Sequence, residues 1–235
     1  MPQFIIDQSF WNLFPQAKIG VLLLKNYQNS DQSSQEIVQL LEESLPLSQA
    51  HLTEDVFSDN PVIQVYRKAY QQFKTKKGAR SSIEALLKRV SGNNPVRSIN
   101  PLVDIYNAAS LRYALPVGAE DLDTFVGDLQ LTITEGGDEF YLIGDDTNQP
   151  TLPGELCYKD QAGAVCRCFN WRDGERTMIT DQTKNAFLVI ELLDTERLGA
   201  LQEALNFIEE AAKQHLQAET SQFILDQDNP RINLA

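Results

Sequence analysis

The spacing of apolar residues changes near Pro116 and again after the last strand-like segment, and these changes set the fold class. Before Pro116 apolar residues recur at helical spacing, and beyond Gly118 the period falls towards two. A long helical stripe then follows the last strand-like segment. This order predicts an α+β fold: a helical N-terminal part, a mainly antiparallel sheet with packed helices, and one long C-terminal helix. The 235 residues fit one large core, so we predict a single domain over 1–235.

The helical half contains four segments with recognisable start or stop signals. "SSQEIVQLLEESL" begins with a capping box at Ser33, and "NPVIQVYRKAYQQF" has Asn60 as N-cap and Pro61 in the first helical position. "RSSIEALLKRVSG" stops near Gly92, and "NPLVDIYNAASLRYALP" stops before Pro116. The longest helix is predicted in "DTERLGALQEALNFIEEAAKQHLQAE", followed by a tail.

Four further segments read as strands. "AKIGVLLLKN" predicts a buried strand, "DLQLTITEGGDEFYLIG" a hairpin around "EGGDE", and "GAVCRCFNW" and "NAFLVIELL" two more. Cys166 and Cys168 would then share a face of one strand, most simply as buried, inert thiols. Glu191 stands near the end of an apolar run, which favours a strand end that reaches water over a pocket that needs an acceptor. Glu120 and its acidic neighbours are expected on a solvated turn.

Charge is distributed very unevenly along the chain. The whole chain has a net charge of −13, which argues against nonspecific nucleic-acid binding by its entire surface. Residues 64–97 nevertheless hold nine basic residues and one acid, whereas the remainder has 11 basic and 32 acidic residues. A local anion or phosphate-backbone site and a solvated helix face both fit such a basic segment.

Several chemistries are absent from the sequence. There is no glycine-rich phosphate loop, no nucleophile elbow, and only two histidines, so neither a cofactor nor a Ser-His-Asp triad is expected. Three cysteines without a nearby histidine predict no metal site and no disulfide framework. The N-terminus lacks signal-peptide features and no window is apolar enough for a membrane span, so we expect a cytoplasmic protein without a membrane partner.

The segment "NPLVDIYNAASLRYALPVGAEDLD" resembles a helix and turn of the B3/4 domain, the editing region of the bacterial phenylalanyl-tRNA synthetase β-subunit. "TITEGGDEF" and "TKNAFLVIE" are similar to later strands of the same family, and the likeness spans about 80–193. No synthetase catalytic module or anticodon-reading domain is visible, so the chain looks like a free-standing B3/4 protein. The positions that match the helix-and-turn pattern are Asn100, Val103, Asp104, Asn107, Pro116, Ala119 and Asp121.

The resemblance implies hydrolysis of the ester in mischarged aminoacyl-tRNA. It places a pocket near Tyr106, Asn107 and Glu191, where the family's glutamate recognises a tyrosyl hydroxyl. A buried acceptor that phenylalanine leaves unpaired would discriminate strongly between the two amino acids. The implied partners are tRNA or aminoacyl-tRNA, with no DNA expected, or a small amino-acid-like ligand. The residues expected to bind RNA are Lys74, Lys76, Lys77, Arg80, Lys88 and Arg89.

The chain departs from the family pattern at three places. A threonine becomes Tyr106, the pocket histidine becomes Gly118, and a glycine pair falls where this chain has "FNWRDG". Glu120 lies close to the missing histidine and is a candidate base. The candidate catalytic residues are therefore Asn107, Glu120 and Glu191, and the candidate substrate-binding residues are Tyr106, Asn170, Trp171 and Arg172.

Three functions stay open on this basis. The first is a hydrolase that acts in trans on mischarged aminoacyl-tRNA, and the second is a non-catalytic binder of tRNA or of a small amino-acid-like ligand. The third is a structural or partner-binding domain with a vestigial pocket. The stretch "FNWRDGERTMIT" is either a solvated hairpin or a reshaped part of the site, with Arg172 and Arg176 at its mouth.

Overall fold

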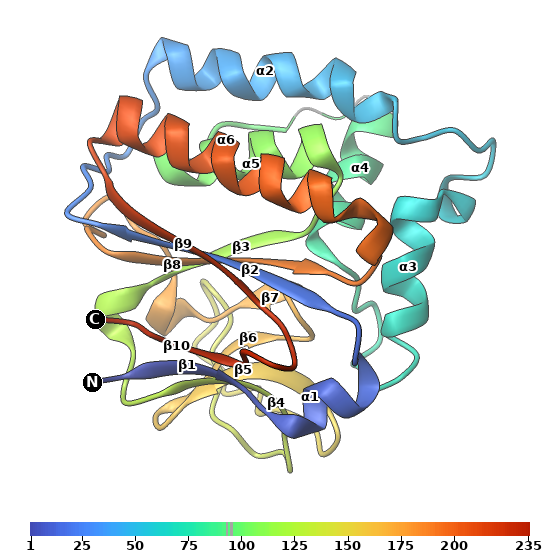
Figure 1. Cartoon of the computed structure of the whole chain (residues 1–235), viewed down its shortest axis with the longest axis vertical. Helices are drawn as coiled ribbons and strands as arrows, with labels where there is room; N and C mark the ends of the chain where they lie inside the picture. Colours follow the sequence, from blue (N-terminus) through green and yellow to red (C-terminus); the bar gives the residue numbers. More distant parts are fainter. Residues whose placement is uncertain (93, 95) are drawn as a thin grey trace.

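The computed structural model describes residues 1–92, 94 and 96–235, and within them six α-helices and ten strands form three layers (Figure 1). The helices are α1 (Gln8–Leu13), α2 (Gln35–Gln49), α3 (Pro61–Ala69), α4 (Ser82–Ser91), α5 (Pro101–Tyr113) and α6 (Leu198–Leu216). The strands are β1 (Gln3–Ile6), β2 (Lys18–Lys25), β3 (Val117–Asp121), β4 (Leu129–Ile133), β5 (Leu156–Asp160), β6 (Gly163–Arg167), β7 (Arg172–Asp173), β8 (Ala186–Leu192), β9 (Glu219–Leu225) and β10 (Arg231–Asn233).

The middle layer is a four-stranded antiparallel sheet in the order β3-β8-β2-β9. Its central strands, β8 and β2, are almost entirely apolar away from their ends, because both faces of the sheet are covered. In β2, Val21 and Leu23 face the core between the two sheets, whereas Leu22 and Leu24 face the helices. The continuous apolar run that marks a fully buried strand therefore arises here in an antiparallel sheet.

The second sheet has six strands in the order β10-β1-β4-β5-β6-β7 and covers the other face of the first (Figure 1). β1 and β4 pair in parallel, and every other described pairing in this sheet is antiparallel. Phe4 lies between the sheets, where its ring contacts Tyr158 and Phe187 at centroid distances of 6.1 and 4.9 Å. The predicted α+β class is confirmed, and the mainly antiparallel strands divide into two packed sheets.

Helices α5 and α6 pack on the outer face of the four-stranded sheet, and α2 lies over them (Figure 1). α3 stands at the side of the layers and ties to both sheets by hydrogen bonds. Tyr66 donates to the backbone carbonyl of Glu191 at 2.6 Å, and Tyr70 donates to that of Cys168 at 2.5 Å. These buried hydroxyls fix two backbone segments that position the polar site described below.

The five predicted helices are all present, with one N-cap displaced by a residue. Ser34, not Ser33, caps α2 by accepting from the backbone of Ile37. Ser33 instead donates to the Asp104 carboxylate at 2.5 Å, which ties the start of α2 to α5. The sequence analysis predicted neither α1 nor the strands β1, β3, β5, β7, β9 and β10, because most of these strands are only two to five residues long and carry little periodicity.

The hairpin predicted around "EGGDE" is wrong. β4 ends at Ile133 and pairs with β5, while residues 134–155 form a long loop between them. The loop is held by its own polar contacts: Thr151 donates to Asp138 at 2.6 Å, and Phe140 lies under the Arg167 guanidinium at 5.5 Å. The alternation of apolar and polar residues after Gly136 and Gly137 therefore belongs to an anchored loop and does not mark a strand.

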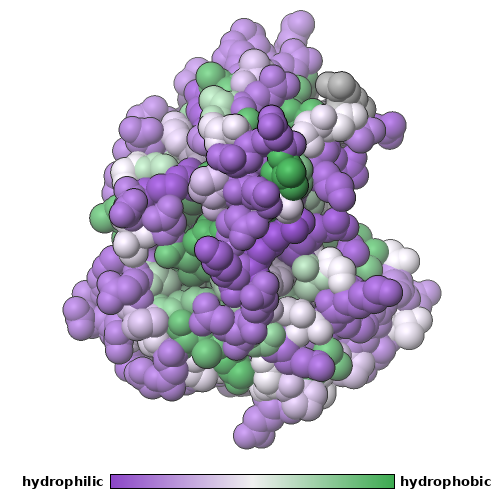
Figure 2. Space-filling model, turned by 90° about the vertical axis from the view of Figure 1, so that its right-hand side faces the viewer, coloured by the Kyte–Doolittle hydropathy of each residue, from purple (hydrophilic) through white to green (hydrophobic). Residues whose placement is uncertain are grey.

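The face of the molecule that carries α3 is mainly hydrophilic (Figure 2). Figure 2 shows the face that carries α3, where hydrophobic residues form only small separate patches among hydrophilic ones. In the described part of the chain, no helix is both long enough and apolar enough to cross a bilayer. The single-domain prediction stays a prediction.

Candidate functional site

Glu191 lies in the interior, so the interpretation that it reaches water at a strand end is wrong. β8 runs on to Leu192 between β3 and β2, and side chains alternate along it. Phe187 and Val189 face the core between the sheets, and Glu191 shares their side. Its side chain is 0% exposed. A carboxyl group in such a core needs partners from the opposite sheet.

Those partners occupy both carboxyl oxygens of Glu191. The Tyr158 hydroxyl of β5 donates to Oε1 at 2.6 Å, and Nδ2 of Asn170 donates to Oε2 at 2.6 Å. Burial raises the pKa of Glu191 to about 8, against the opposing effect of these two hydrogen bonds. The carboxyl therefore takes up a proton far more readily than a free glutamate, and both of its oxygens are engaged by protein groups.

Asn170 reaches Glu191 from the strained turn between β6 and β7. Cys168 and Phe169 both adopt left-handed backbone conformations, with φ of 49° and 56°. β6 ends at Arg167, so the prediction that Cys168 belongs to the strand is wrong. Phe169 is also not a pocket residue: its buried ring contacts Phe10, Phe14, Tyr70 and Phe73. This aromatic anchor holds the turn in place and aims the next side chain at Glu191.

Gly118 makes room for that amide. A Cβ atom at this position would lie 2.0 Å from Oδ1 of Asn170, which is far inside van der Waals contact. β3 places Gly118 beside Val189 of β8, on the face that points to the second sheet. The position where the family pattern has a histidine is thus filled from across the site by Asn170.

A cavity of about 780 Å³ opens next to this cluster, within the usual range for small-ligand sites. α4, α5, the start of β3 and the segment 170–173 form its walls. Four cationic side chains lie around it, and the Arg172 guanidinium stacks over the half-buried Trp171 ring at 5.2 Å. The residues of the sequence prediction that line it are Arg80, Lys88, Arg89, Tyr106, Asn107, Asn170, Trp171 and Arg172.

The remaining predicted basic residues lie elsewhere. Lys74, Lys76 and Lys77 precede α4 and do not line the cavity, and Lys76 donates to the Gln149 side chain at 3.0 Å. Arg176 was expected at the pocket mouth, but it pairs with the buried Asp160 carboxylate at 2.8 Å, so that expectation is wrong. The ion pair with Asp160 holds Arg176 over the β5–β6 turn.

One acidic side chain, Asp173, lines the inner wall of the cavity, and Glu120 lies behind it without lining the cavity. Glu120 lies on β3 and is 5% exposed, so the expectation of a solvated turn is wrong. Burial, followed by the negative charge of Asp173, raises its pKa well above the ordinary value. Asp173 lines the cavity itself, and burial raises its pKa as well. The sequence argument missed Asp173, because a two-residue strand after "FNW" gives no periodic signal.

The three cysteines are free and buried, as the sequence suggests. Burial raises the pKa of all three thiols. Cys166 alone contacts the acidic wall, donating to Asp173 at 3.1 Å.

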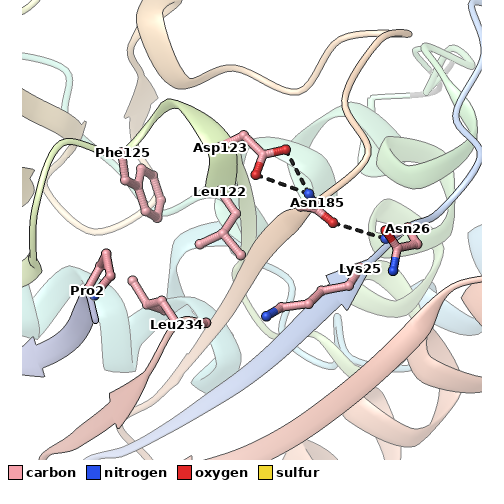
Figure 3. A pocket seen from close by; sticks show the side chains of 9 residues that line it. Pro2, Lys25, Asn26, Leu122, Asp123, Phe125, Asn185 and Leu234 are labelled. Carbon is pink, nitrogen blue, oxygen red and sulfur yellow. Dashed lines mark hydrogen bonds between the residues drawn. The ribbon is translucent and has the colours of Figure 1, made fainter.

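A second hollow of about 350 Å³ lies at the opposite end of β3, near both termini (Figure 3). Two of its polar side chains pair with each other, because Asn185 donates to the Asp123 carboxylate at 2.8 Å, and Asn185 also accepts from the backbone of Asn26 at 3.0 Å. Leu122, Phe125 and other apolar groups fill much of its remaining wall. It offers less chemistry than the cavity beside Asn107.

Comparison with known proteins points in the same direction as the motifs. A family model described as the B3/4 domain matches residues 65–223. The phenylalanine–tRNA ligase β-subunit of Fusobacterium nucleatum subsp. nucleatum is 27% identical over 124 residues, covering 53% of this chain and 15% of that protein. The corresponding subunit of Psychrobacter arcticus is 32% identical over 93 residues, covering 40% of this chain and 11% of that protein. The chain therefore spans a small part of either relative.

Among solved structures, this fold is similar to an N-terminal fragment of the phenylalanyl-tRNA synthetase β-subunit from Pyrococcus horikoshii. The TM-score is 0.49 at 10% sequence identity, covering 95% of this chain and 54% of that one. The family match spans well over half of the sequence and includes α4, α5, β3 and β8, which build the site. The chain belongs to the B3/4 domain family.

Proposed function

We propose that the cavity binds the aminoacylated 3′ end of a tRNA and hydrolyses the ester in trans. The observation that carries this proposal is the composition of one cavity: four cationic side chains, an accessible tryptophan and a polar inner wall. Both curated relatives are phenylalanine–tRNA ligase β-subunits, proteins that by name act on this class of substrate. The strongly acidic remainder of the chain would confine RNA to this basic surface.

The cationic side chains suit the phosphates of the RNA. Arg80, Lys88 and Arg89 are exposed, and among the described residues none of them takes part in an ion pair. Arg67, by contrast, is already neutralised by Glu84 at 2.6 Å. The Trp171 ring, backed by the Arg172 guanidinium, offers a surface on which a terminal base can stack.

The inner wall suits ester hydrolysis without a side-chain nucleophile. The amide of Asn107 lines the cavity and makes no hydrogen bond to the described residues, so its donors are available to a developing oxyanion. Asp173 lines the same wall and can accept a proton from an attacking water, with Glu120 behind it. In this arrangement Glu191 positions Asn170 and does not itself contact substrate.

A second candidate function is binding without hydrolysis. It is favoured by the Glu191 carboxyl, whose two oxygens are occupied by Tyr158 and Asn170 and are not free to recognise a tyrosyl hydroxyl. The loss of a histidine at Gly118 removes one candidate general base. A free amino acid or an uncharged tRNA end would then be the ligand.

A deacylation assay across a panel of mischarged tRNAs separates the two functions. For the preferred tRNA we expect turnover by the full chain and a fall in kcat of about 100-fold in Asn107→Ala, the usual cost of losing one oxyanion donor. Trp171→Ala should raise KM more than it lowers kcat. Asn12→Ala, an exposed asparagine on α1, is the matched control and should leave both constants unchanged. Tight tRNA binding with no turnover on any substrate establishes the binder instead.

The basic rim is tested by the salt dependence of tRNA binding. Arg89→Glu should weaken binding. It should also make the negative slope of log K against log salt shallower by about 0.7–0.9, the value for one lost phosphate contact. Lys184→Glu makes the same charge change at an exposed residue outside the cavity and should leave the slope unchanged. Equal effects of the two changes would mean that only net charge matters, and the rim would lose its role. Lys76→Glu with Lys77→Glu measures how far the surface extends beyond the cavity.

A further inference from the structure

Glu120, Cys166 and Asp173 converge on one point beside the cavity. They come from β3, β6 and β7, and one ligand-capable atom of each lies within 4.8 Å of the other two. Cys166 Sγ and Asp173 Oδ1 are already 3.1 Å apart. Glu120 and Cys166 are 5% and 2% exposed, so water does not screen the cluster. Three acidic groups thus share a small, poorly solvated volume.

One buried carboxylate oxygen of the cluster lacks a close partner. Oε2 of Glu120 makes no hydrogen bond of normal length, and only the Thr177 hydroxyl lies near enough to oppose the rise in the pKa of this carboxyl by hydrogen bonding. The Cys166 thiol, by contrast, already donates to the Phe169 carbonyl at 2.8 Å and to Asp173 at 3.1 Å. Across the described residues neither Glu120 nor Asp173 forms an ion pair with a basic side chain. Buried polar atoms are nearly always satisfied, so the unpaired oxygen of Glu120 points to a further ligand.

We propose that Glu120, Cys166 and Asp173 bind one divalent transition-metal cation, of which Zn²⁺ is the best match. A thiolate with two carboxylates suits Zn²⁺ or Co²⁺ and disfavours Mg²⁺ and Ca²⁺, which prefer all-oxygen sites. On binding, the thiol and any protonated carboxyl release their protons to solvent, and the cation takes their place.

The geometry needs little adjustment to hold such an ion. Zn–S and Zn–O bonds of about 2.3 and 2.0 Å at a tetrahedral angle put neighbouring donor atoms about 3.5 Å apart. The Cys166–Asp173 pair is within that separation, so Glu120 has to approach from at most 4.8 Å by about 1.3 Å, a shift within reach of a side-chain rotation. Positive charge from Arg172 and Arg176 acts on Asp173 and Glu120 respectively and offsets the remaining negative charge.

Three protein ligands leave a fourth position open, as in catalytic zinc sites. Asp173 lines the cavity, so the open position is on the cavity side. A water held there would be in place to attack a bound ester, with Asp173 then acting as a ligand and not as the base, and this last step rests on the proposed function. Metal binding itself does not, because it is measured on the isolated chain.

The test is titration of the chelator-treated full chain with Co²⁺, followed by absorption spectroscopy. We expect one Co²⁺ per chain, a near-ultraviolet thiolate-to-cobalt charge-transfer band, and loss of that band when Zn²⁺ is added. Mg²⁺ should not displace Co²⁺. Cys166→Ser should remove the band, whereas Cys157→Ser, which changes an equally buried thiol outside the cluster, should retain it.

Asp173→Asn provides a second variant at a half-buried position that the fold tolerates more readily. It should weaken Co²⁺ binding by about 100-fold, the upper end for lost outer-shell support and a lower bound for a lost ligand. No charge-transfer band in the folded wild-type chain, or a band that survives Cys166→Ser, overturns the proposal. Co²⁺ binding without any deacylation would leave the metal site standing and remove the proposed hydrolysis. Full deacylation after chelation would leave the proposed hydrolysis standing and would remove the role of the metal in activating water.

Discussion

Glu191→Gln is expected to remove a large pH dependence of stability. The pKa of Glu191 is about 8 in the fold, against 4.5 for the free side chain. The folded state therefore binds the proton more tightly, so the contribution to stability is complete below pH 4.5 and is lost as pH rises towards 8. At 1.36 kcal/mol per unit, the wild-type chain should lose about 4–5 kcal/mol of unfolding free energy across that window through this one group.

Glutamine has the same shape as the protonated glutamic acid side chain but does not ionise. It keeps the shape of the side chain, accepts from the Tyr158 hydroxyl, and can donate to Asn170 once that amide turns its oxygen towards it, so the variant should be the more stable protein at pH 8 and nearly equal at pH 4.5. Urea unfolding at pH 4.5, 6.5 and 8 measures the difference. Glu42→Gln, at an exposed position on α2, should follow the wild-type pH profile. A Glu191→Gln profile parallel to that of the wild type would mean that the carboxyl is already ionised in the fold.

The same residue shows what sequence could and could not predict. The apolar run "NAFLVIEL" correctly predicts β8, because apolar β-branched segments of this length form buried strands. Whether its glutamate is buried depends on which strands lie on either side. β2 comes from residues 18–25 and β3 from residues 117–121, and no local pattern states that they flank β8. Pairing between distant segments thus decided the environment of Glu191.

Helices were the better predicted elements for a related reason. Capping residues such as Asn100 and stop signals such as Gly92 act within a few residues of the helix end they control. The cavity, in contrast, is built from segments that are far apart in the sequence, with α4 and α5 on one side and residues 170–173 on the other. The family pattern located Tyr106 and Asn107, but Asp173 and the filling of the Gly118 position by Asn170 are properties of the packed structure.

The long loop after β4 was mispredicted because a buried ion pair, and not strand pairing, fixes it. Arg167 of β6 and Glu155 at the end of the loop are 2% and 0% exposed in their side chains. Nε and Nη2 of the arginine donate to the two carboxylate oxygens at 2.7 and 2.6 Å, and Nη1 donates to the Gln149 carbonyl at 2.9 Å. Such a fork draws the last part of the loop, from Gln149 to Glu155, onto β6.

Glu155→Gln should therefore destabilise the chain by about 3–5 kcal/mol, because it leaves the Arg167 charge buried and uncompensated. Replacing both partners, with Glu155→Leu and Arg167→Met, should recover most of that loss, since two apolar side chains need no mutual charge. Lys213→Met breaks an exposed pair with Glu209 on α6 and should cost under about 1 kcal/mol. Urea unfolding of the four proteins measures these differences.

If the double variant were no more stable than Glu155→Gln, packing and not charge would explain the loss. Arg167 also directly follows Cys166 in β6, so the pair has a second consequence. Loosening Arg167 should disturb the register between Cys166 and Asp173, which are paired across β6 and β7. Co²⁺ binding should then weaken in Glu155→Gln and return in the double variant, whereas Lys213→Met should bind Co²⁺ like the wild type. Unaltered Co²⁺ affinity in a destabilised Glu155→Gln chain would show that the acidic wall is held by β3 and β7 alone.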